Sequence, residues 1–125
     1  MSDEPLSTAP FSTDVGVELE SATDGTAVAT LSLAPGHSMR ADAVVAHGGV
    51  VFTLADVAAA AAVNSLGEKP SPTVDMRVDF LEPATSDLRA TATVDRTASA
   101  FAFVSILVED ADGETVAKAD GIFKR

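Results

Sequence analysis

One carboxylate stands alone in an otherwise apolar stretch of this chain. Residues 50–63 read Val-Val-Phe-Thr-Leu-Ala-Asp-Val-Ala-Ala-Ala-Ala-Ala-Val, and Asp56 is the only ionisable side chain among them. Such a run predicts a helix that is apolar on every side and therefore buried. Burying a carboxylate is costly unless it is paired, hydrogen-bonded or protonated. Asp56 is therefore a candidate for chemistry rather than for folding.

The start of the same helix supplies a second group that can do chemistry. His47, Gly48 and Gly49 precede the apolar run. The first amides of a helix have no acceptor within it, and the macrodipole makes this end partially positive. Such an end suits the oxygen of a polarised carbonyl, and glycines let a substrate approach the backbone closely.

The spacing of the two groups argues for two chains. Asp56 follows Gly48 by eight positions, which is about 12 Å along a helix axis. A carboxylate that activates water against a carbonyl must lie within roughly 3 Å of that water. If both groups act in one reaction, two antiparallel helices of a two-fold dimer would place Asp56 of one chain beside the partner's Gly48.

The elements that must position these groups follow from the alternation of apolar residues. Strands are predicted near residues 15–20 and 27–33, a helix over about 49–66, and further strands near 74–80, 88–94, 101–108 and 115–124. This order predicts an α+β fold, with one antiparallel sheet wrapped around one long helix. Residues 101–108 are mostly apolar, so both faces of that strand are expected to be covered.

The length and composition of the chain narrow its class. Residues 1–13 are expected to form a flexible arm and residues 14–125 a single domain. A net charge of −11 argues against a nucleic-acid surface. It fits either adaptation to a salty cytoplasm or an ordinary acidic protein. No membrane segment or signal peptide is recognised, so a cytoplasmic protein is expected. The lack of cysteine and the two distant histidines argue against a metal site.

Three segments then match a known family. Residues 47–56, His-Gly-Gly-Val-Val-Phe-Thr-Leu-Ala-Asp, resemble the signature of hotdog-fold acyl-CoA thioesterases of the phenylacetic acid degradation type. Residues 73–84 are similar to the strand that follows the helix in that family, and residues 110–117 to its final hairpin. The resemblance covers nearly the whole chain beyond residue 14. It implies a hotdog fold, a homodimer that assembles into a homotetramer, and hydrolysis of an aryl- or medium-chain acyl-CoA.

The resemblance also implies catalytic roles. Asp56 matches the family's catalytic carboxylate, which acts as general base for water or as nucleophile. Gly48 matches the residue whose amide polarises the thioester carbonyl. Thr73 falls where the family often has a Ser or Thr that orients the water, although Thr is also a good strand former.

Three further residues are assigned to substrate binding, each beside a structural alternative. His47 and Gly49 flank the amide of Gly48, and His47 could equally be a hydrogen-bonded structural residue. Asn64 could touch the acyl group or simply end the helix. No cofactor is expected, because coenzyme A enters as part of the substrate.

Two positions depart from the family pattern. The family usually carries an Asn about six residues before the His, where this chain has Ala41 followed by Asp42. A carboxylate would repel a developing oxyanion, so Asp42 is a poor substitute. The turn before the fifth strand, residues 97–100, lacks the usual Gly and basic residue. The phosphates of coenzyme A therefore have several candidate partners: Arg77, Arg89, Arg96, Lys118 and Lys124.

Two rival functions remain open on the sequence. A hotdog acyl-thioester hydratase or dehydratase would need a carboxylate–histidine pair, for which His47 is the nearby histidine. A non-catalytic acyl-CoA-binding module would tolerate the missing Asn, although it would not require Asp56.

Overall fold

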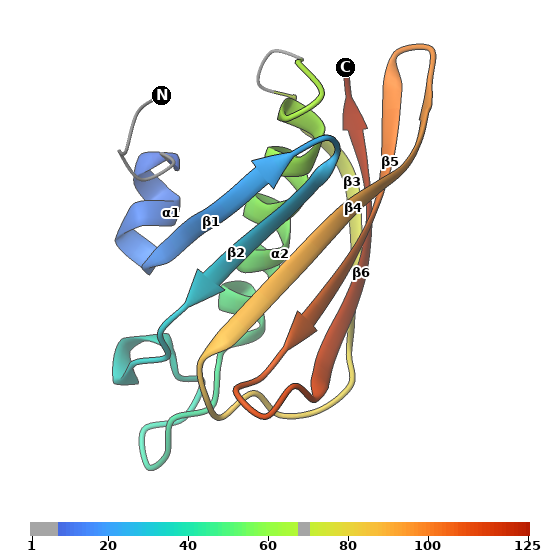
Figure 1. The fold of residues 1–125 in the computed structure, drawn as a ribbon. Coiled ribbons are helices and arrows are strands. Elements are labelled where there is room, and N and C mark those ends of the chain that lie inside the picture. Colours follow the sequence, from blue (N-terminus) through green and yellow to red (C-terminus); the bar gives the residue numbers. More distant parts are fainter. Residues whose placement is uncertain (1–7, 68–70) are drawn as a thin grey trace.

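In the part of the chain that the structure describes, six antiparallel strands wrap around one long helix (Figure 1). The computed structural model describes residues 8–67 and 71–125. In chain order its elements are α1 (Pro10–Val15), β1 (Val17–Thr23), β2 (Thr26–Leu31), the 3-10 turn η1 (Pro35–His37), α2 (Gly48–Asn64), β3 (Thr73–Phe80), β4 (Leu88–Ala98), β5 (Phe101–Glu109) and β6 (Thr115–Lys124). The predicted α+β hotdog arrangement is confirmed.

The order of strands sets where the candidate site can lie. The sheet runs β1-β2-β4-β5-β6-β3, so β3 crosses to the far edge and pairs there with β6. β1 and β3 are the two edge strands of the sheet. Because β3 also contacts α2, the first residue of the strand reaches the middle of the helix.

The hairpin between β1 and β2 follows directly from its turn residues. Asp24 and Gly25 both have positive φ, at 49° and 83°. A two-residue turn of this kind matches the twist of the flanking strands, and Asp-Gly is well suited to it. This turn joins β1 to β2 and starts the sheet that covers the helix.

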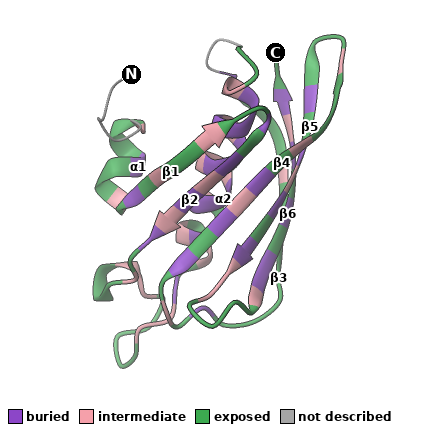
Figure 2. Cartoon of the chain, in the orientation of Figure 1, coloured by how far each residue is buried: buried purple, intermediate pink, exposed green. Residues whose placement is uncertain are grey.

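The helix α2 packs one side against the sheet and leaves the other side open (Figure 2). Leu54, Ala55, Ala58 and Ala62 are fully buried. The three alanines among them have small side chains, which allow the sheet to approach the helix closely. The opposite face, formed by Gly49, Phe52, Thr53 and Asp56, is exposed or half-buried. The prediction of a helix buried on every side is therefore wrong for the single chain.

The sheet likewise buries only its inner face. Along β5, Ala102, Val104, Ile106 and Val108 point into the core, while Phe101, Phe103 and Leu107 are exposed on the outer face. Coverage of both faces of this strand, as its apolar composition predicted, is not found within one chain. The helix lies on the inner face only, which leaves these three side chains uncovered.

The segment before the sheet contains a short helix rather than a loose arm. Pro10 begins α1 and Gly16, with φ 98°, ends it. His37 fixes this end, since its Nε2 donates to the carbonyl of Val15 while its Nδ1 accepts from the amide of Ala34. The predicted flexible arm is thus corrected from Pro10 onward. Residues 1–7 of that predicted arm lie outside the described residues.

Candidate active site

The carboxylate of Asp56 is held by the hydroxyl of Thr73. Thr73 Oγ1 donates a hydrogen bond of 2.6 Å to Asp56 Oδ1. Asp56 lies in the middle of α2 and is half-buried, whereas Thr73 is the exposed first residue of β3. The structure thus brings together two of the three residues that the sequence assigned to catalysis. Among the described residues, the second carboxylate oxygen, Oδ2, has no hydrogen-bond partner.

His47 caps the start of α2 with its own side chain. Its Nδ1 accepts the amide of Gly49 at 2.8 Å, and its carbonyl accepts the amides of Val50 and Val51. The ring of His47 and the amide of Gly49 are therefore engaged with each other. Within the described part of the chain, the amide of Gly48 makes no hydrogen bond. The amide of Gly48 is therefore the free hydrogen-bond donor at the start of α2.

Gly48 opens onto a cavity of about 550 Å³, which we call the Gly48 cavity. Apolar side chains from the loop before α2 and from the end of β3 make most of its wall, among them Met39, Val45, Phe80 and Leu81. A Cβ added at Gly48 would lie 3.3 Å from Cζ of Phe80. The absence of a side chain at Gly48 therefore leaves space for the Phe80 ring close to the backbone.

Asp56 lines a different cavity, which we call the Asp56 cavity. It has a volume of about 640 Å³ and is lined mainly by residues of α1, β1 and α2. Gly48 is not among the residues that line it, and Asp56 is not among those that line the Gly48 cavity. Within one chain the proposed base and the proposed carbonyl-binding amide therefore face separate spaces. The structure agrees with the spacing, which separates them by about 12 Å along α2.

Asn64 is the last residue of α2 and also lines the Asp56 cavity. Its side-chain Oδ1 accepts the amide of Ser71 at 3.2 Å, which ties the end of the helix to the approach of β3. The prediction that the helix closes near Asn64 is confirmed. The same side chain is placed where it can also contact a molecule in the cavity.

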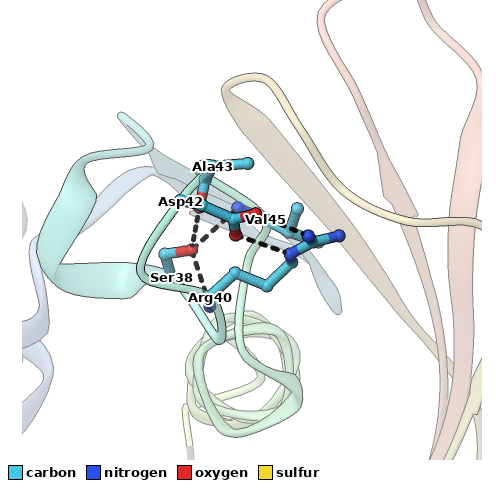
Figure 3. A network of polar contacts seen from close by, with 5 residues as sticks. All are labelled: Ser38, Arg40, Asp42, Ala43 and Val45. Atoms are coloured by element: carbon cyan, nitrogen blue, oxygen red, sulfur yellow. Dashed lines mark hydrogen bonds and ion pairs between the residues drawn. The ribbon is translucent and has the colours of Figure 1, made fainter.

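The loop that carries Ala41 in place of the expected Asn is held together by Ser38 (Figure 3). Ser38 Oγ accepts the amides of Arg40 and Val45, both at 3.0 Å, and donates to the carbonyl of Ala43 at 2.6 Å. This single hydroxyl closes the loop into a compact turn beside the start of α2. Ala41, at the position of the missing Asn, is exposed.

Within this loop Arg40 forms an ion pair with the carboxylate of Asp42. The guanidinium donates through Nε at 2.9 Å and Nη2 at 2.8 Å, and this bond holds the pKa of Asp42 below its usual value. Asp42 does not line the Gly48 cavity, whereas Arg40 does. The carboxylate that would oppose an oxyanion is thus bound to a cation.

Arg40 is a residue that the sequence did not single out. Of the described residues that line the two cavities, it is the one that carries a positive charge. The five basic residues considered from the sequence do not line either cavity. Arg77 instead pairs with Asp79, and Arg89 pairs with Glu20. Arg40 lies in a loop with no periodic pattern, so no sequence signal pointed to it.

Ser12 in α1 was also missed. It lies in the segment expected to be a loose arm, yet it is buried and lines the Asp56 cavity. The sequence did contain a signal for the helix α1, because Pro at the first helical position and Gly just beyond the last position are typical of helix boundaries. Pro10 and Gly16 stand at those positions.

The described part of the chain contains no cluster of three or more His, Asp or Glu side chains arranged to hold a metal ion. In residues 8–67 and 71–125 no helix is long and apolar enough to cross a membrane.

Comparisons with known proteins point to one family. The family model of the thioesterase superfamily matches residues 44–117. The chain is 38% identical over 88 residues to a Halobacterium salinarum protein that carries a provisional esterase name, covering 62% of this chain and 58% of that protein. This chain therefore spans less than two thirds of that relative's length.

Solved structures agree with this match. A conserved protein of Pseudomonas aeruginosa superposes with a TM-score of 0.86 and 28% identity, over 94% of each chain. The Escherichia coli PaaI protein from the phenylacetic acid degradation operon superposes with a TM-score of 0.81 and 29% identity, over 91% of this chain and 86% of that one.

Proposed function

We propose that this chain, which belongs to the thioesterase superfamily, hydrolyses the thioester of an aryl- or medium-chain acyl-CoA to the free acid and coenzyme A. One observation carries the proposal: Asp56 has one oxygen fixed by Thr73 and the other free, at the wall of a largely apolar cavity. A carboxylate so fixed can take a proton from water in a defined direction. A largely apolar cavity beside it suits an acyl group.

The reaction needs the carboxylate and a carbonyl-binding amide at one place. In the proposed site the thioester carbonyl accepts the free amide of Gly48, and water lies against Asp56 of the other subunit. Asp56 takes a proton as the water oxygen bonds to the carbonyl carbon, and the amide stabilises the oxyanion. The carbon–sulfur bond then breaks and the proton passes to the leaving thiolate. Direct attack by the Asp56 carboxylate would use the same geometry.

A dimer that forms this site would also cover apolar surface that one chain leaves open. Phe52 on the open face of α2 is 40% exposed, and on β3 Val74 is 55% and Phe80 57% exposed. β3 is also an edge strand with an unpaired side. Unpaired edges and exposed apolar patches are typical of surfaces that bind another chain. A two-fold partner on this surface would bring its own α2 against Gly48.

A second apolar surface supports the proposed homotetramer. Phe101, Phe103 and Leu107 form a row on the outer face of β5, on the side of the sheet away from α2. Because this row lies on the opposite side of the sheet from α2, it can pair two dimers without disturbing the sites between their subunits.

Arg40 is the proposed partner of the phosphates of coenzyme A. It lines the cavity onto which the Gly48 amide opens, in a chain whose net charge is −11. A guanidinium can bind phosphate oxygens in a bidentate manner. Such a contact would place the nucleotide end of the substrate at the Gly48 cavity and the acyl end toward the Asp56 cavity.

A thiol-release assay over a panel of acyl-CoA esters tests the proposal. The wild-type protein is expected to release free coenzyme A, and Asp56→Asn is expected to fold and assemble normally but to lose turnover by orders of magnitude. Near-wild-type turnover by Asp56→Asn would contradict the assignment. Hydration of enoyl-CoA without thiol release would instead support the hydratase, and binding without turnover the non-catalytic module.

A further inference from the structure

The imidazole of His37 lies between the end of α1 and the turn η1. Its Nε2 donates to the carbonyl of Val15, and its Nδ1 accepts the amide of Ala34 at 3.0 Å. The residue is half-buried and belongs to η1, 22 positions after Val15. Because Val15 is the last residue of α1, this ring attaches the short helix to a separate part of the chain.

A single protonation state of the ring satisfies both bonds. A carbonyl oxygen accepts and does not donate, so Nε2 must carry a proton. A backbone amide donates and does not accept, so Nδ1 must carry none. The ring that makes both bonds is therefore neutral. Proton binding to Nδ1 would point its N–H at that of Ala34, and the bond between them would be lost.

The backbone of His37 reaches the start of α2. Its carbonyl accepts the amide of His47 at 2.8 Å, and His47 caps the helix whose first residue is Gly48. Two positions further along, the amide of Met39 donates to the carbonyl of Val45, also at 2.8 Å. The residue whose ring holds α1 is thus joined through its backbone to the residue that caps α2.

These contacts connect the walls of the two cavities. Ala9 and Ser12 line the Asp56 cavity at α1, while Met39 and Arg40, just after His37, line the Gly48 cavity. His37 itself lines neither cavity. Any effect of its ring on a bound molecule must therefore pass through the position of these walls.

We infer that His37 is a positioning residue, whose neutral ring holds α1 in place as a wall of the Asp56 cavity. Its kinetic consequence rests on the proposed function, which takes this cavity as the space for the acyl group. Loss of the ring bonds should loosen the wall and weaken acyl binding, while the bond between Asp56 and Thr73 is kept. The effect should therefore fall on KM more than on kcat.

The surroundings of the ring offer no bonded charge that would favour its protonation. The segments around it are α1, the start of β1, the loop 38–47 and the segment 81–87, and their charged or titratable side chains are Asp14, Glu18, Arg40, Asp42, His47, Glu82 and Asp87. Among the described residues, none of these side chains pairs or hydrogen-bonds with the ring of His37. A proton on His37 would thus gain no bonded carboxylate to offset the lost bond to Ala34.

Steady-state kinetics with octanoyl-CoA compare two substitutions of His37. His37→Ala removes both ring bonds and is expected to raise KM about tenfold, with kcat changed by less than about twofold. His37→Gln keeps a side-chain N–H that can reach the carbonyl of Val15, so its KM should stay within about threefold of wild type. Equal rises in KM for the two variants, or losses that fall on kcat instead, would overturn the inference.

The pH profile separates the protonation of the ring from its packing. Histidines gain a proton between about pH 8 and pH 5, and the chain has two of them, His37 and His47. KM of the wild type is expected to rise as the pH falls through this range, whereas KM of His37→Gln should not. His47 and Asp56 are present in both proteins, so their titration is common to the two profiles. A rise of the same size in both would overturn the inference.

Hydrogen exchange followed by NMR tests the holding of α1 without turnover. The amide of Gly16 donates to the carbonyls of Ser12 and Thr13 at the end of α1. Its protection factor is expected to fall about tenfold in His37→Ala, and also in the wild type on going from about pH 8 to pH 5, but not in His37→Gln.

The exchange result separates this inference from the proposed function. The expected pattern would support the inference even if the wild-type protein released no thiol and the proposed function failed. Equal protection of Gly16 in all three proteins at both pH values would overturn it, whatever the thiol-release assay showed. Circular dichroism checks that each variant folds, and His37→Gln keeps the test available if His37→Ala does not.

Discussion

Thr73 Oγ1 lies 2.6 Å from Oδ1 of Asp56, across 17 positions of sequence. The bond joins the first residue of the edge strand β3 to the middle of α2. It orients one carboxylate oxygen and leaves the other for water. We propose Thr73 as a positioning residue, which acts through Asp56.

Removing the Thr73 hydroxyl should slow the reaction without abolishing it. Thr73→Ala is expected to lower kcat about tenfold, the scale of one hydrogen bond to a charged group, with little change in KM. Thr73→Ser keeps the hydroxyl and should recover most of the activity. Steady-state kinetics of both variants check this, and equal losses in the two would assign Thr73 a packing role instead.

The amide of Gly48 can be removed with little change to the helix. Gly48 is the first residue of α2, where proline is favoured, and the extended backbone of His47 suits a following proline. Gly48→Pro should lower kcat about a hundredfold or more, as expected for loss of one oxyanion donor. Gly48→Ala is the matched control, because it meets the same Phe80 ring but keeps its N–H. It should retain much more activity than Gly48→Pro, and similar losses would contradict the role of the amide.

Charge changes at the Arg40–Asp42 pair should act in opposite directions. Arg40→Ala is expected to raise KM for acyl-CoA about tenfold, through loss of a phosphate contact, while Asp42→Asn should lower KM because it frees the guanidinium and removes a negative charge. Both effects should shrink as salt screens the charges. The two KM values, measured at low and at high KCl, check this. A rise in KM for both variants would indicate that the pair only stabilises the loop.

Substitutions at two apolar side chains should distinguish the proposed dimer interface from the proposed interface between dimers. Phe52→Asp is expected to break the proposed dimer and abolish activity, because each proposed site needs two subunits. Leu107→Asp, on the outer face of β5 and exposed to a similar degree, should convert tetramers to active dimers. Light scattering and activity on the same samples check both outcomes. An active monomer of Phe52→Asp would contradict the composite site.

The acidic surface should make stability depend on salt. The chain carries 19 Asp and Glu against 8 Lys and Arg. The three ion pairs found among the described residues all lie on exposed side chains. Self-repulsion should therefore lower stability in dilute buffer, and Tm is expected to rise between about 0.1 M and 1 M KCl, over which the screening length falls from about 10 Å to 3 Å. A Tm that is the same at both concentrations would favour an ordinary acidic protein.

The helices and strands could be predicted from the sequence because periodic patterns of apolar residues specify most of them. The alternation in the strands, the apolar run of α2 and the Asp24-Gly25 turn each specify local structure that the fold retains. Asp56 was found for the same reason, as a charge inside an apolar helix. Its exposure was misjudged, because an apolar sequence does not show which faces of a helix its own chain covers.

The contacts between residues of the candidate site join segments that lie far apart in the sequence. No local sequence pattern specifies which of these segments meet. Thr73 meets Asp56 only because β3 crosses to the far edge of the sheet. Arg40 reaches the Gly48 cavity through a loop held by the Ser38 hydroxyl, which resembles any other polar loop in sequence. Ser12 was missed because it lies in a Ser/Thr/Pro-rich segment, and such a composition is typical of a flexible arm.

Mixing two inactive variants tests the composite site most directly. Asp56→Asn and Gly48→Pro are unfolded together, refolded and assayed for thiol release. Each mixed dimer would contain one site in which an intact Gly48 faces an intact Asp56 from the other subunit. Random pairing makes half of the dimers mixed, so about a quarter of wild-type activity should return. Activity no greater than the mean of the two parent variants would contradict the account, since it would place both groups of one site in a single chain.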